Sequence, residues 1–358
     1  MSNPRPRPSA ARARAAAPPA SGRGGRVTMS DVAALARVDK AVVSRVVNDD
    51  KVLSIRPETR ERVHAAIRQL GYRRNMAARS LRTARTGTLG LFIPDFANPV
   101  YAEIITGAEA EALARGCVLM VGTSTAGGRA AKDYLEVLGE GRVDGLLLAG
   151  GPITWAEQET LSSLGIPWLL VNRRGRTTAR HVILDDTRAA LIAVEHLLEL
   201  GHERIAHVGG PAGADTARRR RAGYRKALRQ HELIPDPDLD VVADYTPDGG
   251  ARATTELLAG GARPTAIFVA NVASAIGVLT ALRTAGLSVP EDVSVIAVHD
   301  LPLADHLVPA LTTVRMPLRR LGARAAELLL TTQPGDLISE VVREPIELIV
   351  RQSTGPPS

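Results

Sequence analysis

The stretch from Val27 to Asn48, VTMSDVAALARVDKAVVSRVVN, constrains the fold most, because it predicts two short helices joined by a tight turn. Ser30 precedes an apolar-periodic segment and is expected to cap the first helix. Asp31 then lies at the positive end of the helix dipole. Asp39 is expected to cap a second helix over residues 40–48.

The two faces of this second helix differ in character. Val43, Val46 and Val47 fall on one face by their three-to-four residue spacing. The opposite face carries Lys40, Ala41, Ser44, Arg45 and Asn48. An apolar face docked on the first helix, with short side chains and one long cation outward, suits a helix in the major groove of DNA. An ordinary helical hairpin with a solvated polar face is the alternative for this window alone.

Charge is uneven along the 358-residue chain. Residues 1–85 hold 19 Lys and Arg against 6 Asp and Glu, a net of +13. The remaining residues hold 26 against 32, a net of −6, and the two sum to the formal charge of +7. A basic head on a mildly acidic body indicates a polyanion bound at one end. Residues 1–26, with six arginines and no acid, are expected to form a disordered basic arm.

Composition also bears on location. The single cysteine, Cys117, excludes an intramolecular disulfide and fits a reducing compartment. No apolar run approaches the length of a membrane span, and residues 1–26 lack the hydrophobic core of a secretion signal. We therefore expect a cytoplasmic protein that has no membrane partner.

A third helix is predicted over residues 57–70, with Pro57 at a favourable first position and Gly71 closing it. Its Val63, Ala66, Ile67 and Leu70 are expected to face a small core. Residues 74–86 follow as an arginine-rich, helix-capable linker, for which a basic flexible tether is the alternative.

From residue 88 the pattern changes to apolar strands alternating with amphipathic helices. Strands are predicted at 88–93, 117–123, 145–148, 168–171, 182–184, 205–208, 266–269 and 293–298, and helices at 189–200, 218–230 and 275–285. This alternation predicts parallel sheet covered on both faces. The strands are too many for one comfortable sheet, which favours two similar lobes with a cleft between them.

Four segments strongly resemble the LacI/GalR family of bacterial transcription regulators: VTMSDVA, VVSRVVN, TRERVHAAIRQLGYRRNMAARSLR and TLGLFIPDFANP. The resemblance runs from about residue 27 to residue 350. It implies an all-α helix-turn-helix headpiece at 27–73, a hinge helix at 74–86, and an α/β two-lobed core of the periplasmic-binding-protein type at 87–352. Its sheets would be parallel and doubly wound, with three crossovers between lobes. Lobe one would take about 87–184 and 316–332, lobe two about 185–312 and 340–350, and residues 353–358 would form a tail.

The resemblance also assigns roles in DNA binding. Arg45 matches a recognition-helix arginine that can donate two hydrogen bonds to guanine, while Lys40 and Ala41 match positions that choose the base sequence. In the hinge, Leu81 would wedge into a base step and kink the duplex. The full set is Thr28, Lys40, Ala41, Ser44, Arg45, Asn48, Asn75, Ala78 and Leu81. Four positions depart from the family pattern: Arg37 replaces a turn glycine, Asp39 a serine, Val42 a threonine and Arg74 a proline.

Effector-binding positions implied by the resemblance are Asp95, Phe96, Asn98, Tyr101, Arg173, Arg218, Asn271 and His299. Arg218 is the strongest of these by its spacing to Gly223-Tyr224, although a run of four arginines is ordinarily a solvated helix face. Val272 and His299 replace two sugar-binding aspartates of the family. The expected ligand is therefore less polar, smaller or anionic, or ligand control has been lost.

The resemblance implies a homodimer that binds double-stranded operator DNA, represses a promoter and responds to a small-molecule effector, nucleoid-associated when bound. A leucine heptad tail is absent, which favours a dimer over a tetramer. Rival interpretations are a solute-binding receptor of the same core fold and an effector-independent repressor or activator. An enzyme is not expected, because neither a nucleophile elbow nor a P-loop is visible. His196, His202 and His207 lack metal-ligand spacing, so no metal and no cofactor are expected.

Overall fold

The computed structural model describes residues 27–48, 55–73, 85–123, 141–149, 165–175, 180–333 and 336–358. The chain divides into two units, residues 1–78 and residues 79–358. The predicted basic arm and the predicted hinge residues Asn75, Ala78 and Leu81 lie outside the described residues.

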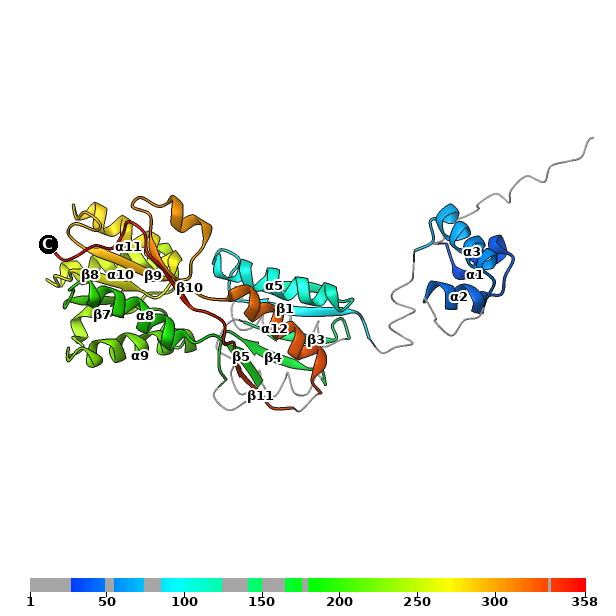
Figure 1. Ribbon diagram of the computed structural model, residues 1–358, viewed down its shortest axis with the longest axis horizontal. Helices are drawn as coiled ribbons and strands as arrows, with labels where there is room; N and C mark the ends of the chain where they lie inside the picture. The colour runs from blue at the N-terminus through cyan, green and yellow to red at the C-terminus, as the bar shows by residue number, and fades with distance from the viewer. Residues whose placement is uncertain are drawn as a thin grey trace, which may run out of the picture. The chain divides into compact units, whose positions relative to one another are not determined.

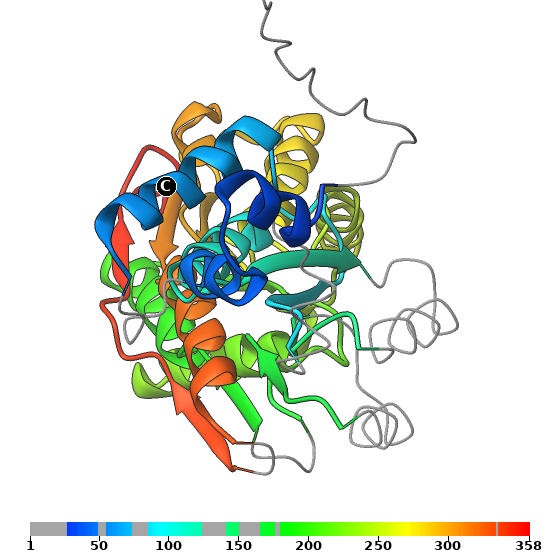
Figure 2. The same ribbon diagram turned by 90° about the vertical axis from the view of Figure 1, so that its right-hand side faces the viewer.

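The first unit contains α1 (Met29–Ala36), α2 (Lys40–Val47) and α3 (Pro57–Leu70), drawn in blue in Figures 1 and 2. Each helix turns its apolar stripe inward, as the spacing predicted. The shared core consists of Val32, Ala33, Ala36, Val43, Val46, Val47, Val63, Ala66 and Tyr72. Helix α3 begins at Pro57 and ends at Gly71, whose φ of 61° is left-handed, so its predicted limits are confirmed.

The predicted cap of the first helix is wrong by two residues. Thr28, not Ser30, caps α1, because its hydroxyl accepts the Asp31 N–H while the Asp31 carboxylate accepts the Thr28 N–H at 2.8 Å. This reciprocal capping box satisfies two amide groups that a helix start leaves open. The Asp39 cap of α2 is confirmed, since its carboxylate accepts the Ala41 N–H at 2.7 Å.

The turn between α1 and α2 contains Arg37, which replaces the glycine expected there. Arg37 adopts φ 53° and ψ 52°, in the left-handed region. A non-glycine residue therefore takes up the left-handed conformation at the position where the family has a glycine. Such a conformation costs roughly 1 kcal/mol for a residue with a Cβ atom.

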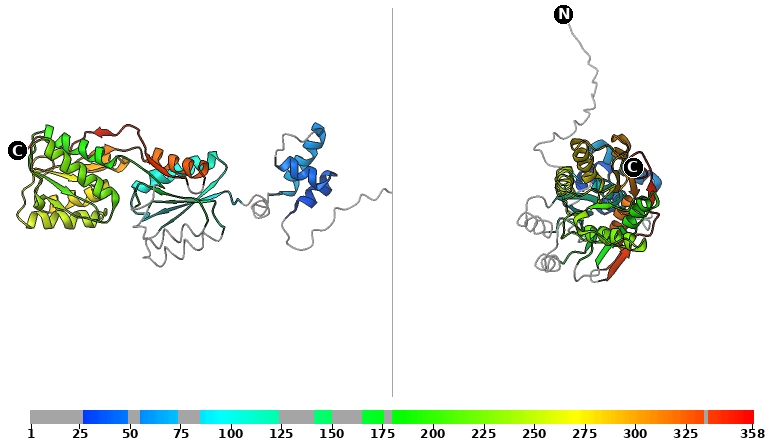
Figure 3. Two further views of the ribbon diagram at one scale, coloured as in Figure 1. Left: turned by 90° about the horizontal axis from the view of Figure 1, so that it is seen from below. Right: turned by 90° about the vertical axis from the view of Figure 1, so that its left-hand side faces the viewer.

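Lobe one of the second unit has a six-stranded sheet in the order β11-β5-β4-β3-β1-β2. Its strands are β1 (Thr88–Ile93), β2 (Val118–Thr123), β3 (Gly145–Leu148), β4 (Trp168–Val171), β5 (Arg180–Ile183) and β11 (Ile338–Val341), all parallel. Helices α5 (Val100–Ala114) and α12 (Leu318–Thr331) lie side by side on one face (Figures 1 and 3). A Cβ on Gly322 would lie 2.0 Å from the Ile104 carbonyl oxygen, so glycine permits this close approach.

Lobe two has a second six-stranded sheet in the order β12-β10-β9-β8-β6-β7. Its strands are β6 (Ile205–Val208), β7 (Asp240–Val241), β8 (Ala266–Val269), β9 (Ser294–Val298), β10 (Thr312–Arg315) and β12 (Glu347–Ile349). Only β12 runs antiparallel to its neighbour, β10. Helices α8 (Asp186–Glu199) and α9 (Asp215–Gln230) cover one face, and α10 (Pro247–Ala259) and α11 (Val272–Thr284) cover the other (Figure 1). Two short 3-10 helices, η1 (Pro237–Leu239) and η2 (Pro302–His306), complete the lobe.

The chain crosses between the lobes three times: from β5 to α8, from β10 to α12, and from β11 to β12. One assignment needs correction. Residues 340 and 341 were expected in lobe two, but β11 pairs with β5 in lobe one, as Figure 2 shows at the edge of the sheet. One final strand was predicted near 340–350. The structure has two strands there instead, β11 in lobe one and β12 in lobe two.

Helix starts in lobe two lie three residues before the predicted ones, at Asp186, Asp215 and Val272. In α8 and α9 the first turn contains polar residues that break the apolar period, whereas α11 begins with Val272 directly after its Asn271 cap. Asp185 and Asn271 cap two of these helices. Strands β7, β10 and β11 were not predicted.

The last residues run across lobe two. Ser353 is fully buried and its hydroxyl donates to the Val295 carbonyl oxygen at 2.6 Å. The Gly355 carbonyl oxygen accepts from His202 Nε2 at 2.8 Å, if that ring nitrogen carries the proton. The tail therefore packs as part of the lobe. Among the described residues, no helix is both long and apolar enough to cross a membrane.

Candidate functional site

The first candidate site is the outward face of α2. Lys40, Ala41 and Arg45 are exposed, whereas Val43, Val46 and Val47 on the other face are buried in the headpiece core. Both ends of the helix are fixed, by the Asp39 cap and by Asn48. The sequence therefore predicted which side chains face outward, and a rigid helix presents them.

Two residues at the margins of this face are engaged within the headpiece. The Asn48 amide donates to the Ser44 carbonyl oxygen at 2.7 Å, and Thr28 belongs to the capping box. Both side chains are exposed. They can therefore offer polar groups to a phosphate oxygen while still closing a helix end.

The second candidate site lies between the lobes, and we call it the interlobe site: Tyr101 and Arg173 from lobe one, and Arg220, Tyr245 and His299 from lobe two. At its centre, Arg220 is 2% exposed. Its guanidinium donates through Nε to Asp186 at 2.7 Å, through one terminal nitrogen to the Ala270 carbonyl oxygen, and through the other to His299 Nε2 at 3.1 Å. Burial lowers and the Asp186 charge raises the pKa of Arg220, and the net direction is upward.

Arg218, the predicted effector arginine, lies elsewhere on α9. Its side chain is 58% exposed and pairs with Asp215 at 3.1 Å, one helical turn earlier. The residue that the fold buries is Arg220, two positions on. The assignment of Arg218 to the ligand side of α9 is therefore a misassignment within the run of four arginines.

Asp186 has a role beyond the helix capping expected of it. It is fully buried, and its two carboxylate oxygens face Arg220 at 2.6 Å and Arg219 at 2.5 Å. The capping role belongs to Asp185 alone, which accepts the Arg188 N–H. A buried carboxylate with two guanidinium partners is a strong polar constraint on α8 and α9.

His299, a predicted effector residue, lies at the end of β9 with φ 76° and is 2% exposed. Burial, together with the neighbouring Arg220 charge, holds the pKa of His299 well below its usual value. Its ring is therefore neutral near pH 7.

Two tyrosines, Tyr101 of lobe one and Tyr245 of lobe two, lie within electrostatic range of each other and of Arg220. The Tyr245 hydroxyl and Thr216 Oγ1 lie 3.0 Å apart, and the Arg220 guanidinium carbon lies 5.9 Å from the Tyr245 ring centre. A Cβ on Gly210 would lie 2.2 Å from that ring, so glycine makes room for it. Burial raises the pKa of Tyr101, which also senses Tyr245, Arg220, Arg173 and Asp95. Sequence reasoning missed Tyr245.

The remaining predicted effector residues mostly serve local structure. The Asp95 carboxylate accepts the Ala97 N–H at 2.9 Å, and Asn98 accepts the Val100 N–H at 3.2 Å. Phe96 is 58% exposed. Asn271 caps α11 by accepting the Ser274 N–H and holds the Tyr245 carbonyl oxygen through its amide.

The lobes are also joined directly beside this site. The Arg174 backbone N–H, after β4 of lobe one, donates to the Asp215 carboxylate of lobe two at 3.0 Å. Asp215 also holds Arg219 at 2.9 Å. The neighbouring arginines outweigh burial and lower the pKa of Asp215, so the carboxylate stays charged.

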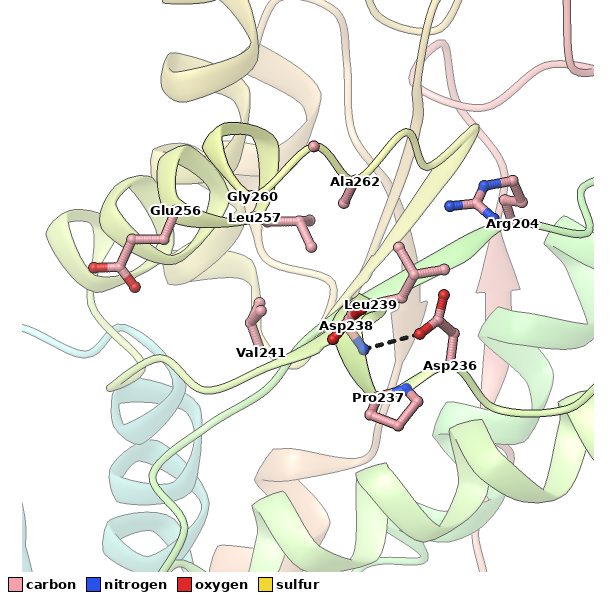
Figure 4. A pocket seen from close by; sticks show the side chains of 11 residues that line it. Arg204, Asp236, Pro237, Asp238, Leu239, Val241, Glu256, Leu257, Gly260 and Ala262 are labelled. Carbon is pink, nitrogen blue, oxygen red and sulfur yellow. Dashed lines mark hydrogen bonds between the residues drawn. The ribbon is translucent and has the colours of Figure 1, made fainter.

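Cavities of the second unit also lie outside the interlobe site. One of about 530 Å³, shown in Figure 4, lies where β6, β7 and β8 begin and is lined by Arg204, Asp236, Leu239, Glu256 and Ala262 among others. Because it opens at the amino ends of the strands, it contains none of the predicted effector residues. Another, of about 420 Å³, lies where β10 leads into α12, and there Asp300 pairs with Arg315 at 2.7 Å.

No group of three or more potential metal ligands occurs within the described parts of the chain. The three histidines considered in the sequence have other partners. His207 contacts Asp240 at 2.9 Å, His202 contacts Gly355, and His196 contacts Thr354 at 3.1 Å. Each lies in a hydrogen-bonded structural setting.

Comparison with known proteins adds independent findings. Residues 28–75 match the family described as bacterial regulatory proteins, lacI family, and residues 194–354 match the periplasmic binding protein-like domain. The ribose operon repressor of Escherichia coli (strain K12) is 36% identical over 312 residues, covering 86% of this chain and 94% of the relative. The transcriptional repressor PurR of Haemophilus influenzae (strain ATCC 51907 / DSM 11121 / KW20 / Rd) is 33% identical over 331 residues, 91% and 98% of the two chains.

Solved structures give the same picture. The lac repressor dimer bound to operator and the anti-inducer ONPF has a TM-score of 0.81 at 29% identity, covering 92% of this chain and 100% of that chain. The regulator CelR in complex with cellobiose has a TM-score of 0.69 at 32% identity, with 92% and 100% covered.

Proposed function

As a member of the lacI family of bacterial regulatory proteins, the chain is a DNA-binding repressor controlled by a small molecule and not an enzyme, and we propose which residues carry each activity. The headpiece would be residues 27–73, the hinge 74–86 and the regulatory core 87–352. We expect the protein in the cytoplasm, on the nucleoid when bound to DNA.

Helix α2 is proposed to lie in the major groove of an operator. The single observation that supports this is the exposure of Arg45 on a helix whose opposite face forms the headpiece core. Arg45 would donate two hydrogen bonds to a guanine edge, and Lys40 and Ala41 would select neighbouring bases. Thr28, Ser44 and Asn48 would contact phosphates, which fix the register of the helix on the duplex.

The hinge is proposed to contact the minor groove through Asn75, Ala78 and Leu81, with Leu81 entering a base step. Unstacking one step bends the duplex, so Leu81→Ala should reduce the bend. Bend angles measured by fluorescence energy transfer on the same operator test this. Equal angles for the two proteins would remove Leu81 from the proposal.

The protein is proposed to act as a homodimer through an apolar surface of the core. Val118 and Met120 on the edge strand β2 are 65% and 41% exposed, and Leu113 on α5 is 69% exposed. Exposed apolar side chains on an edge strand are unusual for a monomer. A second copy with the same surface would cover them by two-fold symmetry. Met120→Glu should therefore shift the mass measured by light scattering from dimer to monomer.

The effector is proposed to bind at the interlobe site, which is supported by the electrostatic interaction of Tyr101 in lobe one with Arg173 and with Arg220 and Tyr245 of lobe two. Asp95, Phe96 and Asn98 would line its lobe-one side, and Asn271 and His299 its lobe-two side. Binding there would change lobe closure and so the separation of the two headpieces. Effector and operator would then alter each other's affinity reciprocally, by about 1 to 3 kcal/mol.

Genome-wide recovery of bound DNA fragments tests the function. The wild-type chain should recover fragments that share one inverted-repeat sequence, because a dimer presents two copies of α2. Arg45→Ala should lose that enrichment. The control is Arg68→Ala, which removes the same charge from the exposed side of α3 and should keep the enriched sequence. A wild-type recovery without any shared sequence would contradict the proposal.

A further inference from the structure

Two proposed effector residues, Asn271 and His299, lie next to each other at the carboxyl ends of β8 and β9. We call this edge of the sheet the floor of lobe two. Strands β8 and β9 pair with Val269 opposite Ala297. Asn271 and His299 each lie two residues beyond these partners, at the carboxyl ends of adjacent strands. Arg220 joins the two positions, since it donates to the Ala270 carbonyl oxygen and to His299 Nε2.

The bond from Arg220 fixes the tautomer of His299. A guanidinium only donates, so Nε2 must accept, and in the neutral ring the proton is then on Nδ1. His299 Nδ1 is buried and has no hydrogen-bond partner among the described residues. A buried N–H without an acceptor costs about 1 to 3 kcal/mol. This donor lies on the side of the ring away from Arg220.

The carboxylate and amide acceptors on the same floor already have partners, whereas the buried Ser274 hydroxyl in the first turn of α11 has none in the part of the chain that the structure describes and can donate as well as accept. Both oxygens of Asp186 face arginines, and the Asn271 carbonyl oxygen accepts the Ser274 N–H at 3.0 Å. Val272, the first residue of α11, offers no polar group. A neutral sugar needs acceptors for its hydroxyl protons, and of the side chains just named only the Ser274 hydroxyl has no partner already among the residues described. That hydroxyl can equally donate to an acid group.

Helix dipoles add a positive field at this edge. Helices α5, α9 and α11 follow β1, β6 and β8, so their amino ends lie at the carboxyl ends of the strands. The first turn of α9 contains Asp215, which is ion-paired, but the first turn of α11 contains no acidic residue. The amino end of α11 is therefore the one beside His299 that lacks a compensating carboxylate.

We propose that the effector is a small carboxylate whose acid group binds between the amino end of α11 and His299 Nδ1. The inference rests on the proposed effector role of the interlobe site and names the class of ligand for it. On the lobe-one side, Asp95 and Arg173 bring one charge of each sign near Tyr101, so they leave this preference unchanged. The acid group supplies acceptors to donors that lack them and supplies no donor of its own.

Matched ligand pairs test the class. The full-length chain is incubated with D-gluconate or D-glucose, D-ribonate or D-ribose, and 4-hydroxybenzoate or its amide. At least one acid should raise the thermal unfolding temperature and change binding to the selected operator, while its neutral partner does neither. A neutral partner that acts as well as its acid, or no response to any of the three acids, would overturn the proposal.

Two isosteric variants test the residue. His299→Asn keeps an N–H donor near the place of Nδ1, whereas His299→Asp puts a carboxylate of the same size there. Because any packing loss is shared, the comparison isolates charge: the active acid should bind His299→Asp at least about tenfold more weakly than His299→Asn. Equal affinities for the two variants would exclude His299 from the ligand site.

Failure of the ligand class can be told apart from failure of the proposed function. The ligand-free chain is titrated with the selected operator and with random duplex in the same series. If the chain still prefers its operator and a neutral ligand changes operator binding, only the carboxylate proposal is rejected. Loss of any operator preference would reject the proposed function whatever the ligand.

Discussion

The face of α2 and the interlobe site place their functional side chains in opposite surroundings. On α2, Arg45 is exposed and the core lies on the other side of the helix. In the interlobe site, Arg220 and His299 are 2% exposed and bonded to each other. Substitution on α2 should therefore change binding and leave folding intact, whereas substitution of Arg220 or its partners should change both.

The largest expected effect is on the stability of the buried site. Asp186→Ala leaves two arginines without their shared carboxylate, and breaking a buried pair typically costs about 3 to 5 kcal/mol. We expect a loss of that size in the free energy of unfolding of the core, measured by urea titration. A loss below about 1 kcal/mol would mean that water solvates Arg220 and that the two sites do not differ as described.

Arg218→Ala is the matched control on the same helix. Its side chain is 58% exposed and pairs with Asp215, which keeps hydrogen bonds to Arg174 and Arg219. The free energy of unfolding should change by no more than about 0.5 kcal/mol. A loss of several kcal/mol in the free energy of unfolding would mean that Arg218, and not only Arg220, is buried and required for stability.

Acid should destabilise the core next most strongly. Burial lowers the pKa values of His196, His202, His207 and His299, so the unfolded chain takes up protons first as pH falls below about 6.5. Stability should then fall by about 1.4 kcal/mol per pH unit for each histidine that stays neutral. Burial raises the pKa of Asp240, but its His207 and arginine partners outweigh this and hold that pKa at about 2. The stability that the charged Asp240 contributes is therefore complete above the usual aspartate pKa and is lost as the pH falls toward 2.

Urea titrations of the core between pH 7 and pH 5 measure this slope. His202→Asn removes one titrating ring, so the slope of the free energy of unfolding against pH should decrease by the contribution of one proton, about 1.4 kcal/mol per pH unit. An unchanged free energy of unfolding across this range would show that the four rings take up protons in the folded core as readily as in the unfolded chain.

Arg45→Ala should weaken binding to the selected operator by about 1 to 3 kcal/mol and leave binding to random duplex nearly unchanged. Filter binding or fluorescence anisotropy at one salt concentration measures both. Unfolding of the headpiece should be unaffected, because Arg45 makes no core contact. Equal weakening of binding to the selected operator and to random duplex would mean that Arg45 contacts a phosphate and not a base.

The smallest effect concerns the start of α1. Thr28→Ala removes the capping box and should lower headpiece stability by about 1 kcal/mol. Ser30→Ala, at the position that the sequence suggested as the cap, should change it by no more than about 0.5 kcal/mol. If thermal unfolding showed a larger loss of stability for Ser30→Ala than for Thr28→Ala, Ser30 would be the cap of α1.

The same contrast explains which predictions succeeded. The headpiece helices are short and amphipathic, so Pro57 and Gly71 predicted the limits of α3, and spacing predicted the buried valines of α2. In α9, the residues Ala217, Arg220, Tyr224, Ala227 and Leu228 share the buried face. That helical period passes through Arg220, and following it instead of the spacing to Gly223 would have found the buried arginine.

Other features had no local signal. Tyr245 reaches Thr216 only because the sheet brings the end of β7 beside α9. The ion pair of Asp186 with Arg220 joins residues 34 positions apart, and β11 enters lobe one only by pairing with β5. These contacts depend on the tertiary fold, which periodicity within one segment does not encode.

The central claim is that α2 reads a particular DNA sequence. The most direct test is the ratio of dissociation constants of the full-length chain for its selected operator and for random duplex, measured by fluorescence anisotropy at one moderate salt concentration. We predict a ratio of at least about 1,000, which Arg45→Ala reduces by about fivefold or more, in line with a lost guanine contact of about 1 to 3 kcal/mol. A ratio near one for the wild-type chain would contradict the account.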